Sequence, residues 1–313
     1  MKGTKGTVAI VGAGTIGAAW AAFFALAGHP VCVADPDEGA PTRLAAMLER
    51  ARPAMAALGT LSDMPTQPQW YRDIAEAMQG AEFIQEALPE DLALKRQVYR
   101  QIEAHAPEDA LLMSSSSGLL PSALQQRLSH PGRFLIAHPC NPAYLMPLVE
   151  LVGGAQTASE ALDRAEKFYR TLGKQTIRLQ HEAVGHLVNR LQAALWREAV
   201  HLVAEGHASV ADVDRAVTEG LGARWTVCGP HTVFHLSGGA EGMAGFLRRL
   251  GPAMQAWWDN LGTPTLDAAT CQRLIEQMNE AAAERTPEQM AAERDAHMLR
   301  VLALTRPDTQ SPE

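Results

Sequence analysis

The sequence predicts a doubly wound α/β sheet in residues 1–183 and an all-α domain in residues 184–313. A short β-branched run at 8–11 ends in glycines, and a small, apolar, helix-forming stretch follows at 15–27. A second apolar run at 31–34 completes a βαβ unit. In the second domain strand patterns fade and amphipathic helix patterns dominate, so we expect the sheet and the later helices to form separate domains.

The remaining elements follow the same alternation. Strand-like and helix-like stretches take turns through the first domain, which predicts a mostly parallel sheet covered on both faces. Near the end, Thr286-Pro287-Glu288-Gln289 fits a capping box with proline at the first helical position. The expected strands are 83–87, 110–114 and 134–137, with edge strands at 148–152 and 176–179; the expected helices are 91–104, 159–172, 184–205, 209–219 and a final one from Thr286.

Composition limits the classes of function. Of the 313 residues, 47% are hydrophobic and 20% are charged, as in ordinary globular proteins. The net charge of −8 argues against a nucleic-acid or anionic-membrane partner, because each needs a basic face. No run approaches the roughly 18 apolar residues of a membrane span. Four widely spaced cysteines form no C-x-x-C pair, and no set of residues has metal-ligand spacing, so we expect reduced thiols, no metal and a cytoplasmic location.

The glycine turn between the first strand and the first helix is typical of a Rossmann-type dinucleotide site. In this pattern Gly12 permits a tight turn, Gly14 lets the backbone approach a pyrophosphate, and Gly17 allows close packing of helix on strand. Asp35 follows Gly17 by 18 residues, where a carboxylate can bind a ribose 2′-hydroxyl and repel a 2′-phosphate. NAD is therefore favoured over NADP, and the alternative is a structural glycine turn with a surface aspartate. The expected cofactor contacts here are Gly12, Gly14, Thr15, Ile16, Gly17 and Asp35.

A second candidate site is the run from His138 to Pro142, which Glu150 follows. An imidazole suits a general base near neutral pH, and a nearby carboxylate would orient it and stabilise its protonated form. If residues 141–145 form a turn, which the two flanking prolines favour, Glu150 can fold back against His138. The alternative is an ordinary loop histidine.

Several separated motifs resemble the L-3-hydroxyacyl-CoA dehydrogenase superfamily. They are Ser115–Ser117, His138–Pro142, Pro147–Glu150 and Gly185–Arg190. The segments Pro89–Leu92, Asn189–Gln192 and Glu219–Trp225 are similar to one branch of it, which contains lambda-crystallin (L-gulonate 3-dehydrogenase) and carnitine dehydrogenase. Residues 238–243 and 246–247 are similar to the carnitine members. The resemblance spans nearly the whole chain.

The resemblance implies an NAD domain followed by a helical domain that forms a homodimer. It implies that His138 is the base, that Glu150 orients it, and that Ser117 and Asn189 bind the reacting oxygen and help to place the nicotinamide. Glu90 and Lys95 match contacts on the cofactor side, and Asn141 of the His-x-x-Asn pattern is expected there too. Without the resemblance, Ser117 would be a turn serine and Asn189 a helix-face amide.

The substrate is less defined by the sequence. The acyl-CoA members are similar to one another in a lysine-rich segment after the second strand, whereas this chain has no lysine between Lys5 and Lys95. That difference argues against a CoA substrate, whose phosphates need cations. A free 3-hydroxy acid needs a cation for its carboxylate, and Arg224 is the candidate, with Trp225 beside it. Trp225, Trp257 and Trp258 could instead form a cage for a trimethylammonium group, or simply be core or dimer contacts.

The sequence therefore predicts an NAD-dependent dehydrogenase that oxidises the 3-hydroxyl of a small L-3-hydroxy acid, similar to L-gulonate or L-3-hydroxybutyrate. L-Carnitine and an L-3-hydroxyacyl-CoA are the alternative substrates. The alternative of another class is a crystallin-like protein that binds NAD without turnover.

Overall fold

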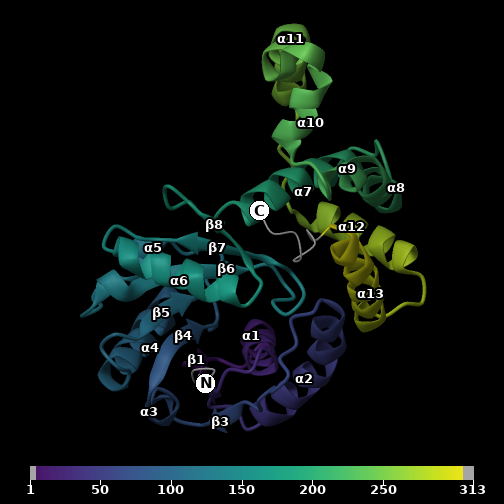
Figure 1. Cartoon of the computed structure of the whole chain (residues 1–313). Coiled ribbons are helices and arrows are strands. Elements are labelled where there is room, and N and C mark those ends of the chain that lie inside the picture. Colours follow the sequence, from purple (N-terminus) through teal and green to yellow (C-terminus); the bar gives the residue numbers. More distant parts are fainter. Residues whose placement is uncertain (1–4, 306–313) are drawn as a thin grey trace. The chain divides into compact units, whose positions relative to one another are not determined.

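The computed structural model describes residues 5–305, and the chain forms two compact units that divide between Arg190 and Leu191 (Figure 1). The sequence-based boundary at 183/184 lies seven residues earlier, in the segment that leads into helix α7 (Val188–Ala204). That helix crosses the division, so its first turn belongs to the first unit. Within residues 5–305, no helix has the length and apolarity needed to cross a bilayer.

The first unit is built on one eight-stranded sheet, as predicted. Its strand order is β3-β2-β1-β4-β5-β6-β7-β8, and only the β6–β7 pair is antiparallel. The order of the first six strands is that of a doubly wound dinucleotide fold. The strands are β1 (Thr7–Val11), β2 (Val31–Ala34), β3 (Gln69–Tyr71), β4 (Ala81–Glu86), β5 (Leu111–Ser114), β6 (Phe134–Pro139), β7 (Leu148–Val152) and β8 (Gln175–Arg178).

Helices cover the sheet because its strands are apolar on both sides. On one face, Trp20 of α1 packs against Tyr169 of α6, with ring centroids 5.5 Å apart. On the other face, Tyr99 of α4 packs against Phe134 of β6 at 5.3 Å. Burying each such side chain contributes about 2 kcal/mol. The helices of this unit are α1 (Thr15–Leu26), α2 (Ala40–Ala57), α3 (Ile74–Ala77), α4 (Leu92–His105), α5 (Pro121–Leu124), the 3-10 turn η1 (Pro131–Arg133) and α6 (Ser159–Thr171).

The second unit is helical, also as predicted. Its expected last helix begins with a capping box, because Gln289 N donates to Thr286 Oγ1 (3.3 Å) while Thr286 N donates to Gln289 Oε1 (2.8 Å). The sequence predicted one helix over 209–219, whereas the structure has a short α-helix that passes into a π-helical turn. Besides α7, its elements are α8 (Val210–Arg215), η2 (Ala216–Gly222), α9 (Ala223–Trp225), α10 (Pro230–Ser237), η3 (Gly239–Glu241), α11 (Gly242–Asn260), α12 (Ala268–Ala282) and α13 (Pro287–Thr305).

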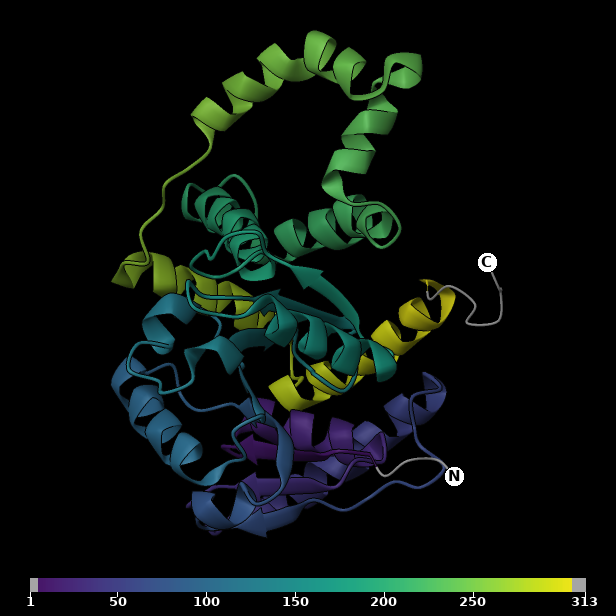
Figure 2. The same cartoon turned by 60° about the vertical axis from the view of Figure 1, so that its left-hand side comes forward.

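Few apolar side chains are buried in the described part of this unit. Helices α10 and α11 form a hairpin, held by the stacked rings of Phe234 and Phe246 (4.7 Å), that projects from the other helices of the unit (Figure 2). Trp257 and Trp258 on α11 are 63% and 61% exposed. Exposed apolar surface of this extent is typical of a protein–protein interface.

Candidate active site

The glycine turn has the geometry that a dinucleotide pyrophosphate needs. Gly12 has a φ of +93°, and a Cβ on Gly17 would lie 1.8 Å from the Gly12 carbonyl oxygen, so both positions require glycine. Nothing lies within 4 Å of a Cβ built on Gly14, which caps α1 and is exposed with Thr15. The half-buried Ile16 completes the first residues of α1, whose first turn contains no acidic residue. The free amides and the open space at Gly14 therefore fit the phosphates of a dinucleotide.

Asp35 lies directly after β2 and faces this turn. Its carboxylate accepts hydrogen bonds from Ala13 N (2.6 Å) and Asp37 N (2.9 Å). Arg43 lies 3.9 Å from Asp35 Oδ1, and it donates to the Ala13 carbonyl (3.0 Å) and to Asp37 (2.5 Å). The guanidinium nearest to the expected ribose site is therefore already paired with two carboxylates. This arrangement fits the 2′-hydroxyl of NAD better than a 2′-phosphate.

His138 and Glu150 are cross-strand partners. They lie directly opposite each other in the antiparallel β6–β7 pair, which places both side chains on one face of the sheet. His138 Nδ1 donates to Glu150 Oε2 over 2.8 Å, in a buried contact. The turn that joins the strands contains bonds from Leu145 N and Met146 N to the Pro142 carbonyl (3.0 and 2.9 Å). With its proton on Nδ1, the imidazole leaves Nε2 as the atom that can accept a substrate proton.

Glu150 is held from two sides. Its other oxygen, Oε1, accepts bonds from the backbone amides of Leu187 (2.8 Å) and Val188 (3.0 Å), at the start of α7. Burial acts to raise the pKa of this carboxyl, but the hydrogen bonds from His138, Val188 and Leu187 outweigh it and lower the pKa below its usual range. Glu150 is therefore an ionised carboxylate that fixes the imidazole and can stabilise its protonated form.

His186 is a residue of this region that the sequence reasoning did not single out. It is fully buried, its ring centroid lies 5.2 Å from that of His138, and its Nε2 donates to the Ser116 carbonyl (2.9 Å). Its backbone adopts the left-handed region with φ +50°, directly after Gly185 at φ +76°. Its place inside the Gly185–Arg190 motif is the sequence signal that could have identified it. In the structure it directly precedes the two amides that bind Glu150.

Glu90 binds the turn that follows β5, residues Ser116–Leu119, which we call the serine turn. Its Oε1 accepts bonds from Ser116 Oγ (2.6 Å) and from the backbone amides of Ser117 (3.1 Å), Gly118 (2.6 Å) and Leu119 (3.0 Å). Burial raises the pKa of Glu90, but the bonds from Ser116 and the amides outweigh it and lower the pKa overall. Ser117 is half-buried at this turn, so Glu90 fixes the position from which its hydroxyl extends.

Lys95, expected on the cofactor side, is fully buried at the start of α4. Its Nζ donates to Glu86 Oε1 (2.6 Å) and to the Leu88 carbonyl (3.0 Å), and it lies 3.8 Å from Glu90 Oε2. Glu90 and Lys95 are therefore both engaged in contacts within the protein. Asn141 is exposed after β6, and Asn189 is half-buried in the first turn of α7, directly after Val188.

Two family models match consecutive parts of the chain. The NAD binding domain of 3-hydroxyacyl-CoA dehydrogenase matches residues 7–183, and the C-terminal domain matches residues 185–283. The chain belongs to the 3-hydroxyacyl-CoA dehydrogenase family. This confirms the resemblance inferred from the separated motifs.

Known relatives place the chain more narrowly. L-Carnitine dehydrogenase of Streptomyces griseus is 42% identical over 300 residues, which cover 95% of this chain and 89% of the relative. L-Carnitine dehydrogenase of Pseudomonas aeruginosa is 39% identical over 301 residues, which cover 96% and 94%. Among solved structures, the NAD-dependent 5-formyl-3-hydroxy-2-methylpyridine 4-carboxylic acid 5-dehydrogenase is 27% identical with a TM-score of 0.82, covering 96% of this chain and 98% of that one. Like other members of its family, the chain is an NAD-dependent dehydrogenase that acts on a CH–OH group.

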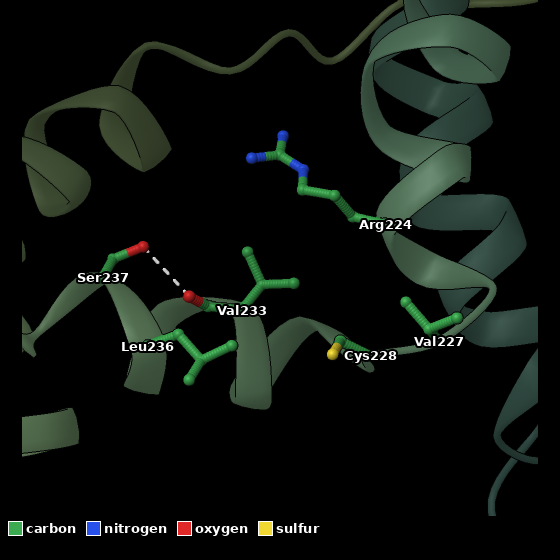
Figure 3. Close-up of a pocket in the computed structure, with 6 residues that line it drawn as sticks. All are labelled: Arg224, Val227, Cys228, Val233, Leu236 and Ser237. Atoms are coloured by element: carbon green, nitrogen blue, oxygen red, sulfur yellow. Dashed lines mark hydrogen bonds between the residues drawn. The ribbon is translucent and has the colours of Figure 1, made fainter.

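Two of the residues predicted for the substrate side, Arg224 and Trp225, lie in the second unit, whereas Ser117 and Asn189 lie in the first. Arg224 lines a pocket of about 360 Å³ with Val227, Cys228, Val233, Leu236 and Ser237 (Figure 3). The Arg224 side chain extends from its helix into the space above Val233, and Ser237 Oγ donates to the Val233 carbonyl (2.9 Å). A pocket that combines one cation with apolar walls suits a small anion with an alkyl part.

The three tryptophans do not form a ready-made cage within residues 5–305. Trp225 lies on the short helix α9 and is 40% exposed, while Trp257 and Trp258 lie on α11. The ring contacts of the described residues join none of the three to another. Adjacent positions on a helix point about 100° apart, so Trp257 and Trp258 leave α11 in different directions.

Proposed function

We propose that the protein oxidises the 3-hydroxyl of an L-3-hydroxy acid to the 3-oxo acid, and that L-carnitine is its substrate. The buried hydrogen bond between His138 Nδ1 and Glu150 Oε2 (2.8 Å) carries the proposal, because it presents a free imidazole nitrogen as a base. The L-carnitine dehydrogenases, at 39–42% identity over nearly the whole chain, favour carnitine over other 3-hydroxy acids.

In this mechanism His138 Nε2 takes the proton from the substrate hydroxyl, and bound NAD supplies the acceptor for the hydride that leaves C3. Glu150 stabilises the imidazolium that forms, and its own position is fixed by the Leu187 and Val188 amides. Ser117 and Asn189 bind the reacting oxygen and help to place the nicotinamide. Asn141, Glu90 and Lys95 support the cofactor side, Glu90 through the serine turn and Lys95 through its buried contacts with Glu86 and Leu88.

Arg224 is the proposed partner of the substrate carboxylate, with Trp225 beside it. Its guanidinium lines a pocket and has the charge and the fork geometry that a carboxylate requires. The chain offers little for the phosphates of CoA, because no lysine occurs between Lys5 and Lys95. A free acid is therefore favoured over a thioester.

The helical unit is the proposed homodimer interface, and the cytoplasm is the proposed location. Large exposed apolar side chains, including Leu236, Leu247, Leu250, Trp257 and Trp258, lie on the α10–α11 hairpin and have no cover within the described chain. A second copy of the chain would remove this surface from water.

A substrate panel tests the function. NADH formation is followed by absorbance with L-carnitine, L-gulonate, L-3-hydroxybutyrate and L-3-hydroxybutyryl-CoA, and we expect L-carnitine to give the highest kcat/KM. Oxidation of the CoA thioester alone would contradict the proposal. If NAD binds while no member of the panel is oxidised, the protein is a binding protein without turnover.

The Arg224 assignment has its own test in the same assay. Arg224→Ala is expected to raise the KM for L-carnitine about 10- to 100-fold, since it removes a charge-assisted contact, and to leave the KM for NAD unchanged. Arg215→Ala, which removes an exposed arginine of the same unit, is the matched control. An unchanged KM for L-carnitine in Arg224→Ala would overturn this assignment.

A further inference from the structure

Two clusters of polar contacts in the first unit contain the residues proposed for the chemistry, and each is centred on one carboxylate. In the first cluster, the Glu150 carboxylate accepts hydrogen bonds from His138 and from the amides of Leu187 and Val188. In the second cluster, the Glu90 carboxylate accepts hydrogen bonds from the serine turn, which contains Ser117. The proposed chemistry needs both clusters in one fixed geometry, because the base and the groups that bind the reacting oxygen must act on the same hydroxyl.

His186 is a residue that contacts both clusters. Its side chain donates from Nε2 to the carbonyl of Ser116, next to Ser117 in the serine turn. Its main chain leads directly into the Leu187 and Val188 amides that bind Glu150. Its ring lies 5.2 Å from the ring of His138.

The backbone at this point is unusual for a residue with a side chain. Two successive left-handed residues, Gly185 and His186, turn the chain so that the next two amides point at the same oxygen of Glu150. Histidine, like asparagine and aspartate, occurs in this region more often than most residues, but the conformation still needs support. The bond to the Ser116 carbonyl supplies that support.

The protonation state of His186 follows from its contacts. A carbonyl can only accept, so Nε2 carries the proton, and Nδ1 is a buried nitrogen without a hydrogen-bond partner. Burial, together with the charge of His138 on β6, lowers the pKa of His186, and these effects outweigh the Ser116 carbonyl, Glu150 of β7 and Glu90 of the loop before α4, which raise it. His186 therefore stays neutral when His138 takes up a proton beside it.

We propose that His186 is a positioning residue of the dehydrogenase, which holds the serine turn in register with the His138–Glu150 pair through its bond to the Ser116 carbonyl. The inference rests on the proposed role of His138 as base. It predicts that the bond, rather than the volume of the ring, is what catalysis requires.

Two variants of similar size separate these possibilities. His186→Phe keeps a ring and the strained backbone but removes the donor, whereas His186→Gln keeps a donor near the position of Nε2. We expect His186→Phe to lower kcat about 10- to 100-fold and His186→Gln to retain kcat within about threefold of the wild type. The KM for NAD should be the same in the two variants.

Hydrogen exchange provides a readout that does not depend on activity. In His186→Phe the Leu187 and Val188 amides should exchange faster than in His186→Gln, because the turn that points them at Glu150 loses its support. Wild-type kcat in His186→Phe, an equal loss in His186→Gln, or unchanged exchange of the two amides would each overturn the proposal. If the wild type oxidises no substrate, the proposed function fails, and the exchange experiment still decides the role of His186.

Discussion

Replacing Glu150 by glutamine removes the charge that faces His138 and leaves the size of the side chain almost unchanged. The two backbone amides of Leu187 and Val188 donate to Oε1, so they will select the amide oxygen of a glutamine at this position. The NH2 group of the glutamine then faces His138 Nδ1, where the carboxylate oxygen stood at 2.8 Å. Because that NH2 group can only donate, Nδ1 has to accept, and the proton of the neutral ring moves to Nε2.

This change affects catalysis in two ways. With its proton on Nε2, His138 can no longer take a proton from the substrate hydroxyl through that atom. In addition, two opposite unit charges about 4 Å apart attract each other by about 4 kcal/mol at an effective dielectric constant of about 20, and glutamine loses this attraction to the imidazolium. Since each 1.4 kcal/mol is about a factor of ten, we expect kcat to fall about 10²- to 10³-fold.

The assay is steady-state NADH formation with the best substrate of the panel. Glu160→Gln, which alters an exposed glutamate at the start of α6, serves as the control and should keep the wild-type kcat. NAD affinity, measured by fluorescence titration, should stay near the wild-type value in both variants. A Glu150→Gln enzyme within about twofold of wild-type kcat would refute the reasoning.

Three further predictions concern the cofactor side. Gly17→Ala should lower the free energy of unfolding by at least about 2 kcal/mol in urea titrations, because its Cβ would meet a backbone oxygen. Gly14→Ala should keep the wild-type stability and weaken NAD binding about tenfold. Equal stability of the two variants would contradict this. Asp35→Asn should raise the KM for NAD about tenfold and reduce the preference for NAD over NADP, and an unchanged preference would count against the ribose contact. The pKa of Glu90 is lowered in the folded protein, so the stability that its carboxylate contributes is present above the ordinary glutamate pKa of about 4.3 and is lost as the pH falls through the folded value. The difference in free energy of unfolding between wild type and Glu90→Gln should therefore close in acid. A difference that is independent of pH would contradict the assignment.

Local patterns were enough to predict most of the first unit. The glycines at 12 and 17 impose a tight strand–helix turn through sterics that depend on only a few neighbours, so the βαβ unit was predictable. Strand β3 was not expected, because it has three partly exposed residues and pairs only with β2. A strand this short is defined by its neighbour in the sheet rather than by its own pattern.

The proximity of His138 and Glu150 was predictable for a similar reason. The prolines at 139 and 142 favour a turn between two apolar runs, and the antiparallel register then sets the two residues opposite each other. Their distance and the burial of the pair could not be predicted, because they depend on α7, which supplies the Leu187 and Val188 amides from the far side.

Other contacts depend on residues that are distant in sequence. The burial of Lys95 follows from its pairing with Glu86, at the end of a strand whose charged last residue looks like a surface position in the sequence. The contact of His186 with the Ser116 carbonyl joins residues 70 positions apart, and no periodicity encodes it. Such pairings are set by the packing of whole elements, so a single sequence does not reveal them.

The most direct test of the account is the turnover of L-carnitine by His138→Gln beside the wild type, with NAD binding measured on both. We expect that the wild type forms NADH, that the variant is about 10²- to 10⁴-fold slower, and that both bind NAD with nearly equal affinity. Full activity in His138→Gln would contradict the role of His138 as the base.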